Sequence, residues 1–181
     1  MLTEILQKVT PIPVLEITDD IKVEPNHIYV IPSNKIMLAT DGVLLLTPRP
    51  EKSKTERYLP IDLFFNSLAI VYQAHAIGII LSGTGSDGTL GLKAIKDYGG
   101  VTIVQDEESA AYPDMPNSAI HSKVVDFILS PDKIPNKLLE VTQIITNPST
   151  IDQNLPLGYE EAFRQINAVL QIRKGTDFTY Y

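Results

Sequence analysis

The chain has 181 residues, of which 44% are hydrophobic and 20% are charged, and its formal net charge is −7. This composition is typical of a globular protein, and the absence of Cys excludes disulfides, thiolate catalysis and Cys-based zinc sites. The negative charge argues against nucleic-acid binding, which needs Lys and Arg against the phosphates, and no apolar run reaches the roughly 20 residues of a membrane span. We therefore expect a cytoplasmic protein without membrane insertion, metal or cofactor.

The first part of the sequence predicts short strands around one hairpin. A helical turn and two strands are expected first, over residues 3–9, 13–17 and 27–31. Apolar runs over residues 36–40 and 43–47 then flank Asp41-Gly42. A two-residue Asp-Gly loop between such runs is typical of a β-hairpin, because both turn positions favour positive φ. The charged segment 48–60 is expected to be a loop.

From residue 60 onward, helices and strands alternate. The apolar spacing predicts helices over residues 60–72, 90–98, 113–122 and 131–145, and strands over residues 77–81, 101–104 and 124–129. Short connections join the first of these strands to its helix and that helix to the next strand, which predicts a parallel pair with a right-handed crossover. The expected class is therefore α/β, with a doubly wound, mostly parallel sheet and an antiparallel hairpin.

A glycine turn, Gly83-Thr84-Gly85-Ser86-Asp87-Gly88, follows the strand over 77–81 and has three interpretations. It fits the dinucleotide pattern G-x-G-x-x-G, with Asp106 18 residues after the last glycine as a ribose ligand. It could instead be a purely structural turn in which Asp87 caps the following helix, where a pyrophosphate would meet a like charge. The third interpretation is a catalytic or orienting Asp87 at the carboxyl end of a strand, where open α/β sheets place their active sites.

The segment GIILSGTGSDGTLGLKAIKDYGGVTIVQDEESAAYPDMPNSAIHSKVVDFIL strongly resembles the C-terminal half of the CheB-type catalytic domain of chemotaxis receptor methylesterases. Upstream, VEPNHIYVIPSNKIMLATDGVLLLT and LPIDLFFNSLA resemble the hairpin and the helix of the same domain, so that the likeness covers roughly residues 3–140. The resemblance implies hydrolysis of glutamyl methyl esters on methyl-accepting chemotaxis receptors by a Ser-His-Asp triad, without a cofactor. It makes Asp87 the triad Asp and Gly83, Thr84, Gly85 and Gly88 its active-site turn. Met115 and Pro116 then belong to a substrate loop.

The same resemblance implies that two triad members are missing. The family's Ser and His lie before the matched region, no Gly-x-Ser-x-Gly element occurs here, and His27, His75 and His121 stand at other positions. We therefore expect a methylesterase domain that lacks roughly its first third and is inactive alone. Its sheet would be incomplete on the N-terminal side, and the open sheet edge could mediate self-association. A non-catalytic α/β interaction module and a dinucleotide-binding domain remain the alternatives.

The C-terminal region has a different character. Residues 146–158 have a linker composition, and beyond them Tyr159, Phe163, Ile166 and Leu170 form one helical stripe. The sequence INAVLQIRKGTDFTYY resembles the start of the CheR-type receptor methyltransferase, without its S-adenosylmethionine site. Thr84 also resembles the residue found at this position in proteins that fuse the esterase to a methyltransferase. Together, the two resemblances imply a fused methylesterase–methyltransferase. The expected domains are residues 1–145 and 159–181, joined by the linker.

Overall fold

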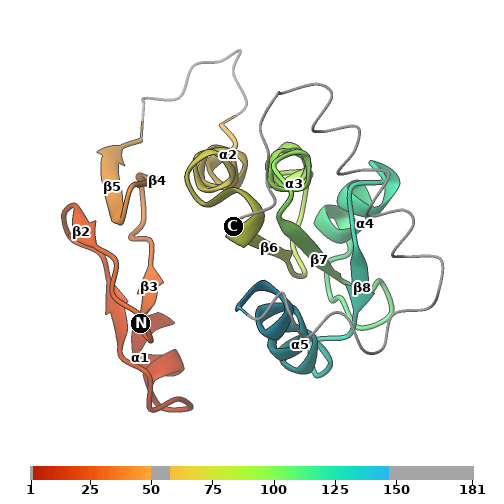
Figure 1. Cartoon of the computed structure of the whole chain (residues 1–181), viewed down its shortest axis with the longest axis horizontal. Coiled ribbons are helices and arrows are strands. Elements are labelled where there is room, and N and C mark those ends of the chain that lie inside the picture. The colour runs from red at the N-terminus through yellow and green to blue at the C-terminus, as the bar shows by residue number, and fades with distance from the viewer. Residues whose placement is uncertain (1, 50–57, 147–181) are drawn as a thin grey trace, which may run out of the picture. The chain divides into compact units, whose positions relative to one another are not determined.

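The computed structural model describes residues 2–49 and 58–146 (Figure 1). The chain divides into two compact units, Met1–Pro135 and Asn136–Tyr181, and each is described by itself. The expected linker after residue 146 and the stripe over 159–170 lie outside the described residues. Within the described ranges, no helix is both long enough and apolar enough to cross a membrane.

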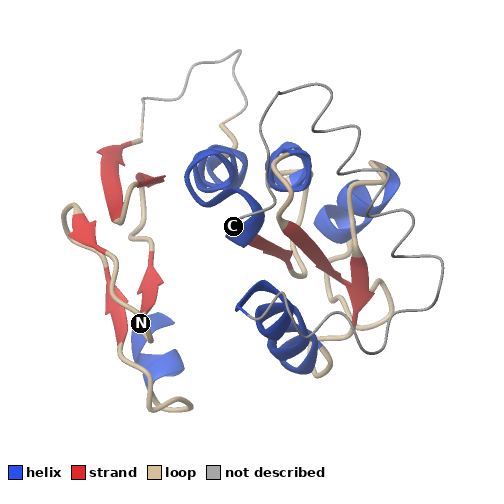
Figure 2. Cartoon of the chain, in the orientation of Figure 1, coloured by secondary structure: helices blue, strands red, loops and turns tan. Residues whose placement is uncertain are grey.

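The N-terminal elements form two small sheets (Figure 2). After helix α1 (Leu2–Gln7), strand β1 (Val14–Glu16) pairs in parallel with β3 (Ile28–Val30). Strands β4 (Lys35–Thr40) and β5 (Val43–Pro48) form the predicted hairpin around Gly42, whose φ of 71° only glycine adopts readily. A two-residue strand, β2 (Ile21–Lys22), joins the outer edge of β5 and was not expected, because so short a strand exists only through its partner.

The second part is a parallel α/β arrangement. Its elements in chain order are α2 (Pro60–Tyr72), the 3₁₀ turn η1 (Gln73–His75), β6 (Ile77–Ile80), α3 (Thr89–Asp97), β7 (Val101–Gln105), α4 (Asp114–His121) and β8 (Phe127–Leu129). Helix α5 (Ile134–Thr146) follows in the chain and lies mostly in the second unit. The strands pair in parallel in the order β6-β7-β8, so the predicted parallel pair is confirmed. Helices α2 and α3 lie side by side against this sheet (Figure 1).

Strand β8 is shorter than the expected 124–129 because side chains replace the first rungs of its ladder. The Asp126 carboxylate accepts hydrogen bonds from the amide (2.9 Å) and the hydroxyl (2.8 Å) of Thr102 on β7. The Val124 carbonyl lies 2.7 Å from the same hydroxyl oxygen and shares its single hydrogen with the carboxylate. These bonds fix the chain beside β7 before regular pairing begins.

Helix α2 belongs to both hydrophobic cores. One core joins α2 and α3 to the parallel sheet; it contains Phe65, Ala69, Ala76, Ile80, Leu92, Ile95, Val104, Ala119 and Val124. The other lies under the hairpin and contains Ile17, Ala39 and Leu44, against which Phe64 and Leu68 of α2 pack. The Ser67 hydroxyl also accepts a hydrogen bond from the Ala39 amide (2.9 Å). Burying one such large apolar side chain contributes about 1.5–3 kcal/mol, so α2 fixes the hairpin against the parallel sheet.

Candidate active site

The glycine turn leaves the carboxyl end of β6 and enters α3, as the sequence predicts. Gly85 and Gly88 have φ values of 89° and 91°, which an L side chain rarely adopts. A Cβ on Gly88 would also lie 2.8 Å from Ile80 Cδ1 and 2.9 Å from Ile61 Cγ2. The last glycine is therefore required by both conformation and packing, and it lets the turn press against α2.

The turn is tied to the segment that carries Met115. The Gly83 amide donates to the Tyr112 carbonyl (2.8 Å), and the Met115 amide donates to the Gly83 carbonyl (3.0 Å). A Cβ on Gly83 would lie only 2.4 Å from Met115 Sδ. The structure thus brings the expected active-site turn and Met115 together, but Met115 and Pro116 lie in the first turn of α4 and not in a loop. Pro116 is fully buried, whereas Met115 is half-buried beside the turn.

Asp87 caps a different helix from the one that follows it. Its Oδ2 accepts a hydrogen bond from the Ile61 amide (3.1 Å) and its Oδ1 accepts one from the Asp62 amide (3.0 Å), both in the first turn of α2. Helix α3 begins after Gly88 without a side-chain cap from that residue. The expectation that Asp87 caps α3 is therefore wrong. Because α2 packs against the turn, its first amides are available to Asp87 and compete with the amides of α3.

The cap of α3 comes from Asp62, which sequence reasoning missed. The Asp62 Oδ1 accepts a hydrogen bond from the Gly91 amide (2.7 Å), and the residue is only 5% exposed. Burial raises the pKa of the Asp62 carboxyl, and the negative charge of Asp87 adds to that rise, while N–H groups at the start of α3 oppose it. An acid at the third position of a helix that starts with Pro60 is a recognisable sequence signal. That signal, however, indicates a cap of the helix that contains the acid, which is α2 and not α3.

This arrangement disfavours the dinucleotide interpretation. A pyrophosphate would bind the free N–H groups at the start of α3, and the buried Asp62 carboxylate already accepts from them. Asp106, the candidate ribose ligand, accepts a hydrogen bond from the Ser109 amide (2.8 Å) in its own loop. Across the described part of the chain, no three His, Cys, Asp or Glu side chains gather as metal ligands would.

The three histidines lie elsewhere. His27 donates through Nδ1 to the Pro25 carbonyl (2.9 Å), and His121 donates through Nδ1 to the Asn117 carbonyl (2.6 Å). His75 is exposed in η1. Within residues 2–49 and 58–146, no hydrogen bond joins a histidine to Asp87.

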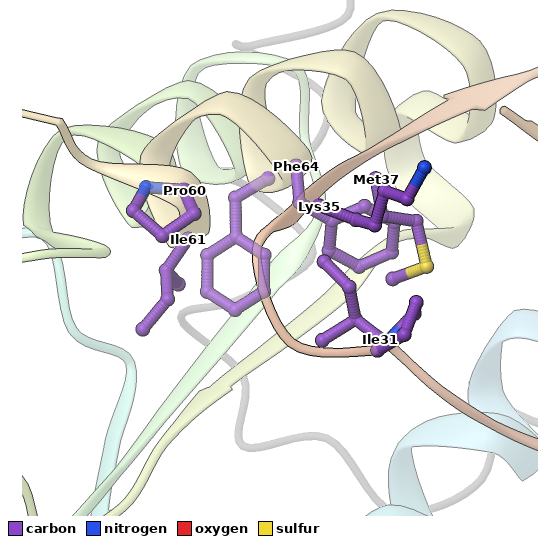
Figure 3. Close-up of a pocket in the computed structure, with 8 residues that line it drawn as sticks. Ile31, Lys35, Met37, Pro60, Ile61 and Phe64 are labelled. Atoms are coloured by element: carbon purple, nitrogen blue, oxygen red, sulfur yellow. The ribbon is translucent and has the colours of Figure 1, made fainter. Parts of the chain in front are cut away.

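An apolar pocket of about 320 Å³ opens between the hairpin and the start of α2 (Figure 3). Its lining comes from the segment between β3 and β4, from β4 and from α2, and comprises Ile31, Pro32, Lys35, Met37, Pro60, Ile61, Phe64 and Phe65. Ile61 connects this pocket to the turn, because its side chain lines the pocket while its amide donates to Asp87.

Comparison with known proteins identifies the class. The fold matches the crystal structure of the Thermotoga maritima CheB methylesterase catalytic domain with a TM-score of 0.68 and 30% sequence identity, covering 77% of this chain and 75% of that one. Residues 1–138 match the CheB methylesterase family. The chain belongs to the CheB methylesterase family, and the α/β class that the sequence predicted is confirmed.

Two relatives show how such a sequence is distributed among longer proteins. A 104.1 kDa uncharacterized protein of Rhodobacter capsulatus is 35% identical over 133 residues, which are 74% of this chain and 14% of that protein. A protein-glutamate methylesterase/protein-glutamine glutaminase 1 of Pseudomonas fluorescens is 39% identical over 110 residues, which are 60% of this chain and 32% of that protein. The chain therefore spans a minor part of both relatives.

Proposed function

We propose that this chain carries the acidic member of a Ser-His-Asp triad that hydrolyses glutamyl methyl esters on methyl-accepting chemotaxis receptors. The supporting observation is Asp87 at the carboxyl end of β6, with both carboxylate oxygens bound by backbone amides. In such a triad the carboxylate orients the imidazole and stabilises the imidazolium that forms when Ser attacks the ester. The other active-site groups in this proposal are the turn residues Gly83, Thr84, Gly85 and Gly88, together with Met115 and Pro116 at the start of α4.

The nucleophile and the base are proposed to come from outside these 181 residues. No Gly-x-Ser-x-Gly element occurs in the sequence, and the hydrogen bonds of His27 and His121 are to carbonyls of their own segments. Without Ser or His, the acyl transfer has no attacking oxygen or no proton acceptor. We therefore expect no ester hydrolysis by this chain alone.

A complementation assay tests both statements. Methanol release from methylated receptor is measured with this chain alone and with a separately produced fragment of a CheB catalytic domain that carries the Ser turn and the His. We expect turnover only in the mixture, and a loss of about 10⁴-fold in kcat with Asp87→Asn. Asp97→Asn, at an exposed acid on α3, is the matched control and should keep full activity. Turnover by the chain alone, or a mixture that is insensitive to Asp87→Asn, would contradict the proposal.

The alternative is a non-catalytic interaction module, and one observation favours it. In the described residues β6 has a neighbouring strand on one side only, and an unpaired strand edge can pair with another chain. Self-association through this edge predicts a concentration-dependent mass in size-exclusion chromatography with light scattering. A monomer at every concentration would argue against it. Titration with NAD(H) and S-adenosylmethionine should show no binding.

The wider organisation also belongs to this proposal. The division into residues 1–145, a linker over 146–158 and a methyltransferase-like start over 159–181 rests on the CheR-type resemblance of the last segment. The Rhodobacter relative, in which the match covers 14% of a 104.1 kDa chain, supports occurrence within a larger protein. A cytoplasmic protein that takes part in chemotaxis and receptor demethylation completes the proposal. The sequence adjoining this chain in its genome tests it.

A further inference from the structure

Two carboxylates connect α2 and α3 reciprocally. Asp87, just before α3, accepts from the amides of Ile61 and Asp62 at the start of α2. Asp62, at the start of α2, accepts from the amide of Gly91 at the start of α3. Each acid therefore caps the helix of the other, and neither cap can form unless the two helix starts are in register.

The environment of Asp62 is more demanding than that of Asp87. Asp62 is 5% exposed, and its Oδ2 has no hydrogen-bond partner among the described residues. Leaving a buried carboxylate oxygen unpaired is costly, and a second carboxylate nearby adds repulsion. The partial positive charge at two helix N-termini offsets this cost. An apolar residue at position 62 would avoid this cost altogether. The hydrogen bond that Asp62 accepts from α3 therefore explains why an acid occupies the position.

Close packing makes the register unique. A Cβ on Gly91 would lie 2.5 Å from Phe65 Cβ and 3.1 Å from Asp62 Cα, so the backbone of α3 contacts α2 directly there. A Cβ on Gly88 would meet side chains instead, those of Ile61 on α2 and Ile80 on β6. The turn that carries Asp87 is thus clamped between the Asp62–Gly91 bond and the end of β6.

We propose that Asp62 is a positioning residue for Asp87, holding the start of α3 where both oxygens of Asp87 meet the amides of α2. This fixes the direction in which the remaining lone pairs of Asp87 face a histidine. The functional part of the inference rests on the proposed triad role of Asp87. The structural part does not depend on it.

Amide hydrogen exchange tests the positioning directly, because the first amides of a helix have no acceptor within that helix. The Ile61 and Asp62 amides lie in the first turn of α2, so their protection from exchange depends on their hydrogen bonds to Asp87. In ¹H–¹⁵N spectra recorded after transfer of this chain into D₂O, the wild-type Ile61 amide should exchange at least about tenfold more slowly than an unprotected amide. A wild-type Ile61 amide that exchanges as fast as an unprotected one would overturn the inference.

Variants at residue 62 separate positioning from mere folding. Asp62→Ala removes the acceptor, and we expect the exchange protection of the Gly91 and Ile61 amides to fall by about threefold or more relative to the interior amides of α2. Asp62→Asn keeps an acceptor for Gly91, so it should restore most of the protection of both amides. If Asp62→Ala does not fold, Asp62→Ser, which suits a helix start but has a shorter side chain, takes its place. Asp97→Ala, at an exposed acid at the other end of α3, should change neither amide.

Unchanged exchange protection of the Ile61 amide in the folded Ala or Ser variant would refute the positioning role. The spectra use no substrate, so this failure is distinct from failure of the proposed hydrolysis. In the complementation assay, Asp62→Ala should lower kcat at least about tenfold with KM unchanged, and Asp62→Asn should recover most of it. Loss of activity without any change at the Ile61 amide would likewise contradict the inference.

Discussion

Replacing Gly91 by Ala tests whether close approach of α2 and α3 organises the candidate site. The new Cβ would lie 2.5 Å from Phe65 Cβ and 3.1 Å from Asp62 Cα. Carbon atoms normally approach to about 3.5–4.0 Å, so the helices must separate by about 1 Å. Phe65 Cβ and Asp62 Cα are attached to, or part of, the backbone and have no rotamer to change. The Asp62–Gly91 hydrogen bond, now 2.7 Å, would lengthen with the separation.

The two opposing effects can be compared. Ala is favoured over Gly inside a helix by about 1 kcal/mol, whereas overpacking costs about 1–3 kcal/mol and weakening the bond to a buried carboxylate about 1–3 kcal/mol. We expect a net destabilisation of about 1–5 kcal/mol, or a fall in Tm of at least about 2–4 °C for a chain of this size. Urea and thermal unfolding, followed by circular dichroism, measure it.

The matched control on the same helix is Lys93→Ala, which adds no atom between the helices. Lys93 is exposed and forms an ion pair with Asp97, so its loss should change stability by about 0.5 kcal/mol or less. If Gly91→Ala were as stable as the wild type, or more stable, helix propensity would outweigh packing. The clamped register inferred for the turn would then be refuted.

Three further predictions follow from single contacts. Burial raises the pKa of the Asp126 carboxyl, but the Lys96 ammonium and the hydrogen bonds from Thr102 outweigh burial and hold that pKa below its ordinary range. Asp126→Asn should therefore destabilise the chain at pH 7 by about 1–3 kcal/mol. The difference between Asp126→Asn and wild type should shrink as the pH falls below about 4, because the carboxyl group of the unfolded chain binds a proton there and that of the folded chain does so only at lower pH; a pH-independent difference in urea unfolding would contradict this. Ser67→Ala removes the acceptor for a β4 amide and should cost about 1–2 kcal/mol, measured as a loss of amide exchange protection in the hairpin; unchanged protection would argue against that bond. Gly83→Ala should cost about 1–3 kcal/mol by overlap with Met115, and Met115→Ala should relieve most of that cost in the double variant, whereas additive costs would refute the contact.

Local signals in the sequence determined most of the elements. Asp41-Gly42 between two apolar runs predicted the hairpin, because the turn needs positive φ and the strands need alternation. Pro60 at the start of an apolar helical stripe predicted α2 over the residues observed. The glycine turn between an apolar run and a helical pattern predicted the parallel pair, and Asp87 lies in the connection from β6 to α3. These features depend on neighbours within a few residues, which a sequence displays.

The partners of the two acids were decided only by the tertiary structure. From sequence, Asp87 should cap α3, because nearby amides are the ones a local pattern can count, and no role was expected for Asp62. In the fold, Gly91 lets α3 approach Phe65 so closely that the two helix starts face each other. Each carboxylate then finds better-placed amides on the other helix. Such a choice depends on the distance between segments about 25 residues apart, which local patterns do not encode.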